Sequence, residues 1–262
     1  MRSDPIYRAF LRDALLAYAA WTAATYLLEG LPGTLVRPEA VGLRLAYALV
    51  AGLGLGILLP LWRLRALVRA GAASPEDLGF GSARRAVQGV AIAAVAGCAL
   101  FAINFDPPAP AVAVLNAFAQ VWVVSVAEVL VCWGLVGSAV ALALRARGRT
   151  AAAIGGALVA SALFGLYHFA HSPPFNSWAM VGFLSGIGLA TSAWWFISRD
   201  AYGTAIFHNF FAVTGVLAAL RAAGLVPEHP APETPLFGMA AVATIALVVP
   251  AIAWVRRAKP AQ

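Results

Sequence analysis

Long apolar stretches alternate with short polar connections along the chain. The eight stretches cover residues 11–30, 45–62, 86–104, 111–144, 151–170, 177–198, 204–221 and 235–255. Each is about long enough to cross the hydrocarbon core of a bilayer as a helix. The pattern predicts an all-α, polytopic transmembrane bundle with about eight spans, and residues 1–262 are expected to form a single membrane-embedded domain.

The fourth stretch is longer than a simple span requires. Residues 111–144 would form a helix of about 51 Å, whereas about 30 Å crosses the hydrocarbon core. We therefore expect this helix to be tilted, kinked or broken, most plausibly near Gly134 and Gly137.

The composition excludes other classes of protein. Hydrophobic residues make up 62% of the chain and charged residues 11%, whereas about 25% of the residues in a soluble domain are charged. So few charges could not cover a soluble globule, and so much apolar side chain excludes disorder. The net charge of +7 comes from residues between the apolar stretches, so we expect contacts with lipid headgroups and no nucleic-acid partner.

The basic residues also predict an orientation. With eight spans, 15 of the 18 Lys and Arg residues fall on one side, and only Arg37, Arg44 and Arg221 fall on the other. The positive-inside rule then places both termini in the cytoplasm. Abundant alanine, and arginine in place of lysine at all but one position, are typical of a GC-rich bacterial genome, so we expect a multi-pass protein of the bacterial inner membrane.

Three ionisable residues lie well inside the predicted spans: Glu128, His168 and His208. Such residues are costly in a bilayer, which makes them candidates for function. A buried carboxylate beside an imidazole can activate water, and a second imidazole can donate a hydrogen bond to an oxyanion. His171 lies close to a helix end, so we interpret it as an interfacial residue, and His229 falls in a connection.

Motifs around these residues resemble those of a known family. The sequence SALFGLYH at 161–168 resembles the FxxxH motif of the CAAX-protease and bacteriocin-processing (CPBP, or abortive-infection) family of intramembrane glutamic endopeptidases. The sequence GTAIFHN at 203–209 resembles the approach to the family's third motif. AEVLVCWG at 127–134 resembles its first motif, EExxxR followed by Gly. The resemblance covers residues 110–220, which we expect to form a CPBP-like catalytic core.

The chain departs from the family pattern in its first and third motifs. With Glu128 as the first glutamate, Val129 replaces the second glutamate and Trp133 replaces the arginine, while Gly134 keeps its place. The alternative register, with Glu128 as the second glutamate, loses Gly134. In the third motif, Ala212 stands where the family has Asn or Asp, and Asn209 directly follows His208.

The resemblance implies a division of labour among these residues. Glu128 and His168 would activate a water that attacks a peptide bond of a membrane-associated peptide or protein substrate. His208, with Asn209 if the helix is turned appropriately, would stabilise the oxyanion. One glutamate and two histidines suffice to bind zinc in principle, but no HExxH motif is present, and we expect neither a metal nor another cofactor. The sequence leaves the oligomeric state open.

Simple spans place these residues at different depths. His168 falls about 17 residues into its span and His208 about 4 into the next span of the same direction, a gap of roughly 20 Å. Either the helix of His208 starts inside a cavity, or that of His168 is displaced, or the three residues form no common site. The alternatives to a peptidase are a catalytically silent scaffold or binding protein, favoured by the missing motif residues, and a small proton-coupled transporter, since intramembrane Glu and His residues also serve pumps.

Overall fold

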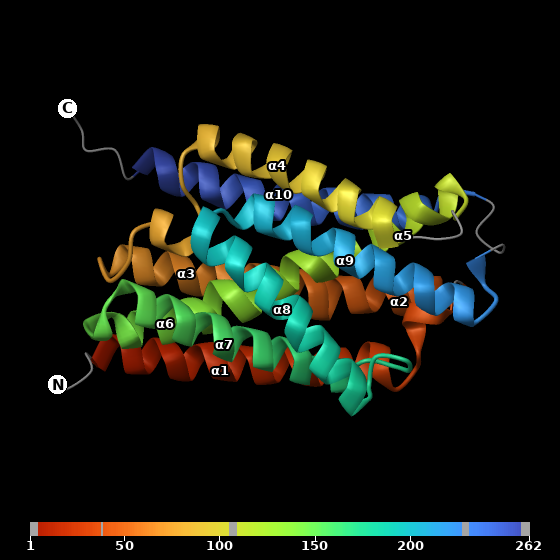
Figure 1. Ribbon diagram of the computed structural model, residues 1–262, viewed down its shortest axis with the longest axis horizontal. Coiled ribbons are helices and arrows are strands. Elements are labelled where there is room, and N and C mark those ends of the chain that lie inside the picture. The colour runs from red at the N-terminus through yellow and green to blue at the C-terminus, as the bar shows by residue number, and fades with distance from the viewer. Residues whose placement is uncertain (1–4, 38, 105–108, 227–230, 258–262) are drawn as a thin grey trace.

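Helices lie side by side along the length of the molecule (Figure 1). The computed structural model describes residues 5–37, 39–104, 109–226 and 231–257, and no strand occurs among them. The predicted all-α bundle is therefore confirmed. The α-helices are α1 (Pro5–Thr25), α2 (Val41–Tyr47), α3 (Leu59–Arg69), α4 (Ala83–Asn104), α5 (Ala111–Glu128), α6 (Ser138–Leu144), α7 (Arg149–Tyr167), α8 (Trp178–Ser198), α9 (Ala201–Ala222) and α10 (Thr234–Arg257).

Short π- and 3-10-helical segments extend several of these helices. The π-helices are η1 (Tyr26–Gly30), η3 (Ala48–Leu58) and η5 (Val129–Gly137), and the 3-10 turns are η2 (Thr34–Val36), η4 (Glu76–Leu78), η6 (Arg145–Arg147) and η7 (His168–Ala170). Each of the eight apolar stretches thus corresponds to one long helical rod. Within the described residues, six rods are long and apolar enough to cross a membrane. Those of α1 and α10 fall outside that set, so the count of eight spans stays a prediction.

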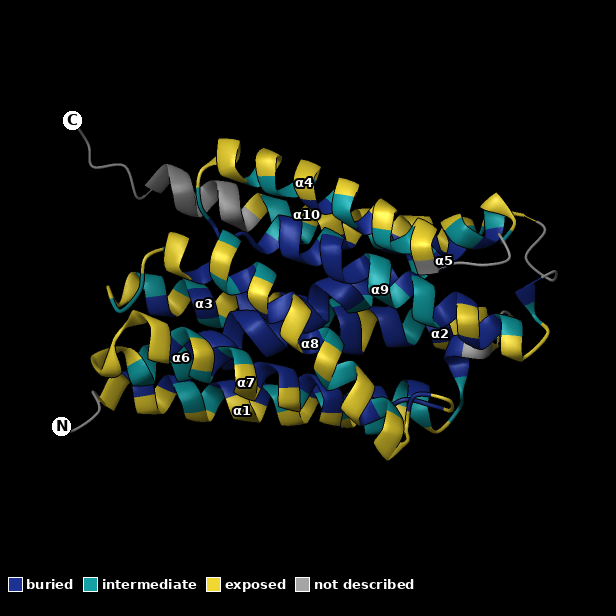
Figure 2. Cartoon of the chain, viewed as in Figure 1, coloured by how far each residue is buried: buried dark blue, intermediate teal, exposed yellow. Residues whose placement is uncertain are grey.

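The fourth rod forms the centre of the bundle. It runs without a break from Ala111 to Arg147, but between Val129 and Gly137 it is π-helical. The break that the sequence allows near Gly134 and Gly137 does not occur, and the helix continues there with π-helical hydrogen bonding. Every residue from Val121 to Ala139 except Val124 is buried, because other helices surround this apolar rod on all sides. Figure 2 shows the buried residues gathered in the middle of the bundle.

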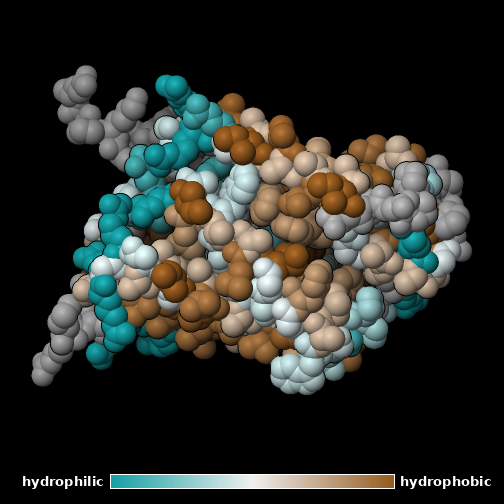
Figure 3. All heavy atoms as spheres, in the orientation of Figure 1, coloured by the Kyte–Doolittle hydropathy of each residue, from teal (hydrophilic) through white to brown (hydrophobic). Residues whose placement is uncertain are grey.

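The outer surface is apolar around the middle of the molecule. Large hydrophobic side chains such as Val95, Phe183 and Ile197 are exposed, and Figure 2 shows the outward faces of α1, α4 and α8 as exposed. Hydrophilic residues gather at the end where α1 begins and α6 meets α7 (Figure 3). An apolar belt with polar ends is the surface that a bilayer requires. Which end faces the cytoplasm stays a prediction of the positive-inside rule.

The start of α9 is fixed from two directions. The Asp200 carboxylate accepts hydrogen bonds from the backbone N–H groups of Tyr202 and Gly203 at 3.3 and 2.8 Å, which caps the helix. The backbone N–H of Ala201 also donates to the carbonyl of Gly79, directly after η4, at 2.8 Å. Burial raises the pKa of the Asp200 carboxyl to about 6, and the hydrogen bonds from the two backbone N–H groups together with Arg85 oppose this only in part.

Gly56 allows η3 to approach the central rod closely. A Cβ atom added there would overlap the Cβ of Ala127 and come within 3.1 Å of Nε1 of Trp21. We expect Gly56→Ala to lower the free energy of unfolding by about 1–3 kcal/mol, since overpacking forces neighbouring helices apart. Thermal unfolding of the purified protein in detergent measures the change. Gly182→Ala in α8, where an added Cβ meets nothing within 4 Å, is the matched control, and equal losses in both variants would contradict the packing argument.

Asp200 gives a prediction about pH. Because its pKa is raised in the folded protein above the ordinary value near 3.9, the folded state holds its proton more tightly, and stability falls as pH rises from about 4 through about 6. Asp200→Asn keeps an oxygen acceptor for the cap but cannot ionise. We expect its melting temperature to rise relative to wild type across this range, as measured by thermal scans at several pH values. A difference that does not change with pH would contradict this prediction.

Candidate active site in the membrane interior

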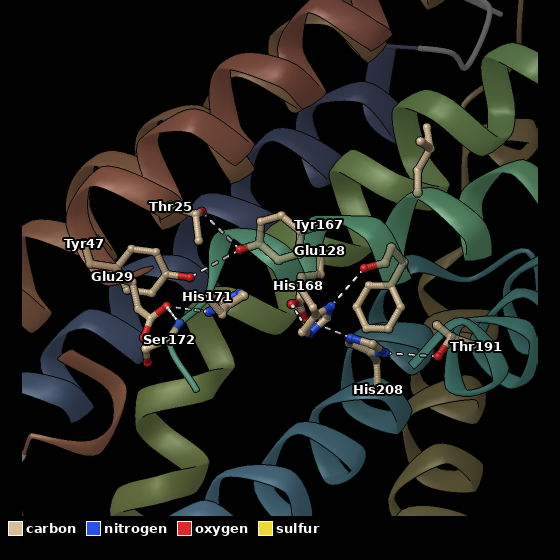
Figure 4. Close-up of polar contacts among 12 residues, drawn as sticks. Thr25, Glu29, Tyr47, Glu128, Tyr167, His168, His171, Ser172, Thr191 and His208 are labelled. Atoms are coloured by element: carbon tan, nitrogen blue, oxygen red, sulfur yellow. Dashed lines mark hydrogen bonds and ion pairs between the residues drawn. The ribbon is translucent and has the colours of Figure 1, made fainter. Parts of the chain in front are cut away.

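The Glu128 carboxylate contacts two imidazoles from two other helices. Its Oε2 lies 2.9 Å from Nε2 of His208 in α9, and its Oε1 lies 3.8 Å from Nε2 of His168 in η7. All three residues are buried, and Figure 4 shows their side chains converging. The structure therefore brings together the three residues that the sequence singled out within the spans.

The hydrogen bonds of His208 indicate where its protons lie. The Thr191 hydroxyl in α8 donates to the backbone carbonyl of Ile187, so its oxygen accepts a hydrogen bond from Nδ1–H of His208 at 3.0 Å. With Nδ1 protonated, the short contact between Nε2 and Glu128 holds one proton between the two groups. The Glu128–His208 pair is thus neutral as a whole, which makes its burial tolerable.

His168 is oriented in the same way, but its Nε2 lies farther from Glu128. Its Nδ1 lies 2.8 Å from the backbone carbonyl of Phe164, which can only accept, so Nδ1 carries the proton of the neutral ring. Nε2 then keeps its lone pair and faces Glu128. The Phe164 ring lies edge-to-face with both His168 and His208, at centroid distances of 4.7 and 5.0 Å. The phenylalanine of the FxxxH motif thus separates and orients the two imidazoles.

The depth difference expected from the sequence does not keep the histidines apart. His168 directly follows α7, whereas His208 is in the second turn of α9, and two helices starting at one level would separate them by about 18 Å. In Figure 1, however, α9 begins further along the bundle than α7 does. The cap at Asp200 and the contact with Gly79 fix this deeper start. Of the three alternatives left open by the sequence, the contacts of Glu128 with both histidines exclude the third, that the residues form no common site.

A second buried pair of Glu and His lies beside the first. Nδ1 of His171 lies 2.9 Å from Oε2 of Glu29, and both side chains are at least 94% buried. The Glu29 carboxylate also accepts hydrogen bonds from the backbone N–H of Ser172 at 3.0 Å and from its hydroxyl at 2.6 Å. The interpretation of His171 as an interfacial residue was wrong, because η1 extends the first helix far enough to cover it. The three-residue spacing from His168 is the one signal in the sequence that pointed to His171.

The rings of Tyr47 and Tyr167 pack against His171, and their hydroxyls contact each other. Tyr167 accepts from or donates to Thr25 at 3.1 Å and Tyr47 at 3.3 Å, and its ring stacks on Trp21 at a centroid distance of 3.8 Å. The Tyr167 ring also meets the edge of His171 at 4.9 Å. These contacts hold the end of α7 against α1 and α2, as the labelled residues in Figure 4 show.

Asn209 does not join the group. It is fully buried, but its amide nitrogen and oxygen have no hydrogen-bond partner among the described residues, and it is not among the residues that line the cavity at the site. One residue along a helix turns the side chain by about 100°, so Asn209 points away when His208 points in. His229, the fourth histidine, lies outside the described residues.

The replaced motif residues surround the site with apolar groups. Trp133, at the position of the family's arginine, packs at a centroid distance of 5.3 Å from both Phe164 and His208. Its indole N–H donates to the Ser192 hydroxyl at 2.7 Å. Val129, at the position of the second glutamate, is buried. Neither residue gives Glu128 a charged neighbour.

Asn116 and Gln120, two further polar residues of the central rod, join α5 to neighbouring segments. Asn116 donates to the carbonyl of Ala231 and accepts from the N–H of Glu233, while Gln120 accepts from Arg44. Arg44 forms an ion pair of 2.7 Å with Glu233. These contacts tie α5 to α2 and to the segment before α10, as expected of polar residues that join helices.

A cavity of about 610 Å³ opens onto Glu128, His168, His171 and His208. Apolar residues of α8 and α9 form a large part of its wall, among them Phe183, Ile187, Phe210 and Phe211. Its size is within the range of ligand pockets. The cavity thus combines a largely apolar lining with one carboxylate and three imidazoles.

Comparison with known proteins gives no independent assignment. No family model matches the chain, and neither the curated proteins nor the solved structures contain a significant match.

Proposed function

We propose that this protein is an intramembrane endopeptidase that hydrolyses peptide bonds of membrane-associated proteins or peptides. The observation that carries the proposal is the position of the Glu128 carboxylate. It lies between two imidazoles on the wall of an apolar cavity. The motif resemblance to the CPBP family supports the same reaction class.

Glu128 and His168 form the water-activating pair. Oε1 of Glu128 and Nε2 of His168 lie 3.8 Å apart, which is too far for a hydrogen bond between them. Both atoms can therefore accept a proton from a water at the cavity wall. The water oxygen attacks the peptide carbonyl carbon as its proton passes to this pair. The same proton is then delivered to the leaving amine, so that the carbon–nitrogen bond breaks and the site returns to its starting state.

His208 supplies the hydrogen-bond donor for the oxyanion. The proton that it shares with Glu128 moves fully to Nε2 when the carboxylate and the oxyanion compete for it, so that the N–H faces developing negative charge. Thr191 holds the ring in this orientation through Nδ1. Asn209 has no part in the proposed site.

The walls of the cavity favour an apolar substrate. The residues that line it include no Lys, Arg or Asp, and Glu128 is the one acidic residue among them. A transmembrane or lipid-modified segment can therefore enter from the bilayer without losing the hydration of charged groups. The composition, rich in alanine and arginine, supports a location in the bacterial inner membrane, and the charge pattern of the connections supports cytoplasmic termini.

Removal of the water-activating pair is the direct test. We expect Glu128→Gln and His168→Ala each to reduce cleavage of a model transmembrane peptide by about 10²–10⁴-fold, which is the usual contribution of a general base. The measurement is mass-spectrometric detection of cleaved peptide by protein reconstituted in nanodiscs. Glu76→Gln changes an exposed carboxylate and should cleave at the wild-type rate.

Two other outcomes would overturn the peptidase proposal. Wild-type protein that binds membrane peptides without cleaving them, with binding unchanged in Glu128→Gln, would identify a catalytically silent scaffold. Proton-coupled uptake in proteoliposomes that is lost in Glu128→Gln, with no cleavage, would identify a transporter.

A further inference from the structure

We infer that Glu128, His168 and His171 form a binding site for a zinc ion. One nitrogen of each imidazole and one oxygen of the carboxylate lie within 4.8 Å of one another, and all three residues are buried. The inference concerns the same site as the proposed function, because zinc would be held by Oε1 of Glu128 and Nε2 of His168, the two atoms that accept the proton of water in the metal-free reaction. Its test needs no substrate, and the site exists whether or not the protein cleaves peptides. It also revises the expectation from the sequence that no metal is needed.

The distances between the three donor atoms, at most 4.8 Å, are somewhat longer than those in a zinc site. Zinc binds histidine nitrogen and carboxylate oxygen at about 2.0–2.2 Å in a tetrahedral arrangement, which puts neighbouring ligands about 3.4 Å apart. The donor atoms must therefore approach one another by at most about 1.4 Å, which small side-chain rotations achieve. Two histidines and one glutamate are the protein ligands of many catalytic zinc sites, where the fourth position stays open for water or substrate.

Each histidine is already held by its other nitrogen. Nδ1 of His168 donates to the Phe164 carbonyl, and Nδ1 of His171 lies 2.9 Å from the Glu29 carboxylate. Histidines that bind metal through one nitrogen are held in this way by a carbonyl or a carboxylate on the other nitrogen. Ser172 fixes Glu29 in turn with two hydrogen bonds, so an outer group of partners supports the site.

The free nitrogen of His171 has no other purpose in the structure. Both nitrogens of this buried side chain lack a hydrogen-bond partner among the described residues, but Nδ1 forms the ion pair with Glu29. In Figure 4, His171 lies between Glu29 and the group of Glu128 and His168, with its second nitrogen on the side of that group. An unpaired nitrogen lone pair in an apolar interior is unfavourable, and a cation bound between His171, His168 and Glu128 would satisfy it.

Only one oxygen of Glu128 would bind the ion, because the other contacts His208. Oε2 contacts His208, while Oε1 faces His168, so the carboxylate would bind zinc through one oxygen. The residues lining the cavity include no lysine or arginine, and the ion would therefore supply positive charge that no side chain there provides. Imidazole and carboxylate ligands with an open position also suit other divalent transition metals, but the four-coordinate geometry favours zinc.

Metal content of the full-length protein tests the inference. Protein purified in detergent micelles is stripped with a chelator, incubated with Zn²⁺, desalted and analysed by elemental mass spectrometry. We expect one zinc ion per chain in wild type. His171→Ala should lose the stoichiometric ion, and Glu29→Gln should weaken zinc binding by about 10–100-fold, as is usual for an outer partner of a ligand. Glu39→Gln, at an exposed carboxylate paired with Arg37, should bind zinc as wild type does.

Cobalt provides a second readout for variants that fold poorly. Co²⁺ in a tetrahedral site with two nitrogen ligands gives intense visible absorption, which should be present in wild type and absent in His171→Ala that elutes as a folded monodisperse species. Wild type that binds no zinc, or that binds it equally in His171→Ala, would overturn the inference.

The two proposals fail separately. Peptide cleavage that survives complete chelation would leave the peptidase in place while showing that zinc takes no part in its reaction. Stoichiometric zinc binding without any peptide cleavage would leave the metal site and remove the peptidase.

Discussion

The cost of burying the Glu128 carboxylate governs the centre of this protein. A lone carboxylate in an apolar interior would be strongly unfavourable, and the bundle offsets this cost with His208 at 2.9 Å and His168 at 3.8 Å. Because the two imidazoles come from different helices, the positions of α7 and α9 relative to the central rod are tied to this contact. The N-terminus of α9, capped by Asp200, must lie where it does for His208 to reach Glu128.

A second buried carboxylate, Glu29, is also compensated by a histidine, His171, three residues after His168. Glu29 is fully buried and is compensated by His171 and by two hydrogen bonds from Ser172. The two carboxylates thus approach the end of α7 from opposite sides, Glu128 from the central rod and Glu29 from the π-helical extension of α1. Both pairs belong to one buried polar layer, in which His168 and His171 lie at a centroid distance of 5.2 Å.

The departures from the family motifs have a consistent physical effect. Trp133 and Val129 are apolar where the motif that the chain resembles has charged residues, so within the described residues histidines provide the charge compensation of Glu128. A neighbouring arginine would have kept the carboxylate ionised with a fixed positive charge. Histidines can instead exchange protons with it or bind a cation, and this difference underlies both the proposed water activation and the inferred zinc site.

The helical class, the positions of the eight rods and the three costly residues follow from the amino-acid sequence, because span length and the expense of an ionisable group in lipid are local properties. The length of the fourth stretch did not reveal that its helix continues unbroken through a π-helical segment near Gly134 and Gly137. Only the tertiary structure decided which polar groups meet. The depth at which α9 starts, the inclusion of His171 and Glu29, and the exclusion of Asn209 all depend on how whole helices shift and rotate against one another. Those shifts are set by contacts between residues more than 100 positions apart, such as Glu29 with Ser172, which no local pattern encodes.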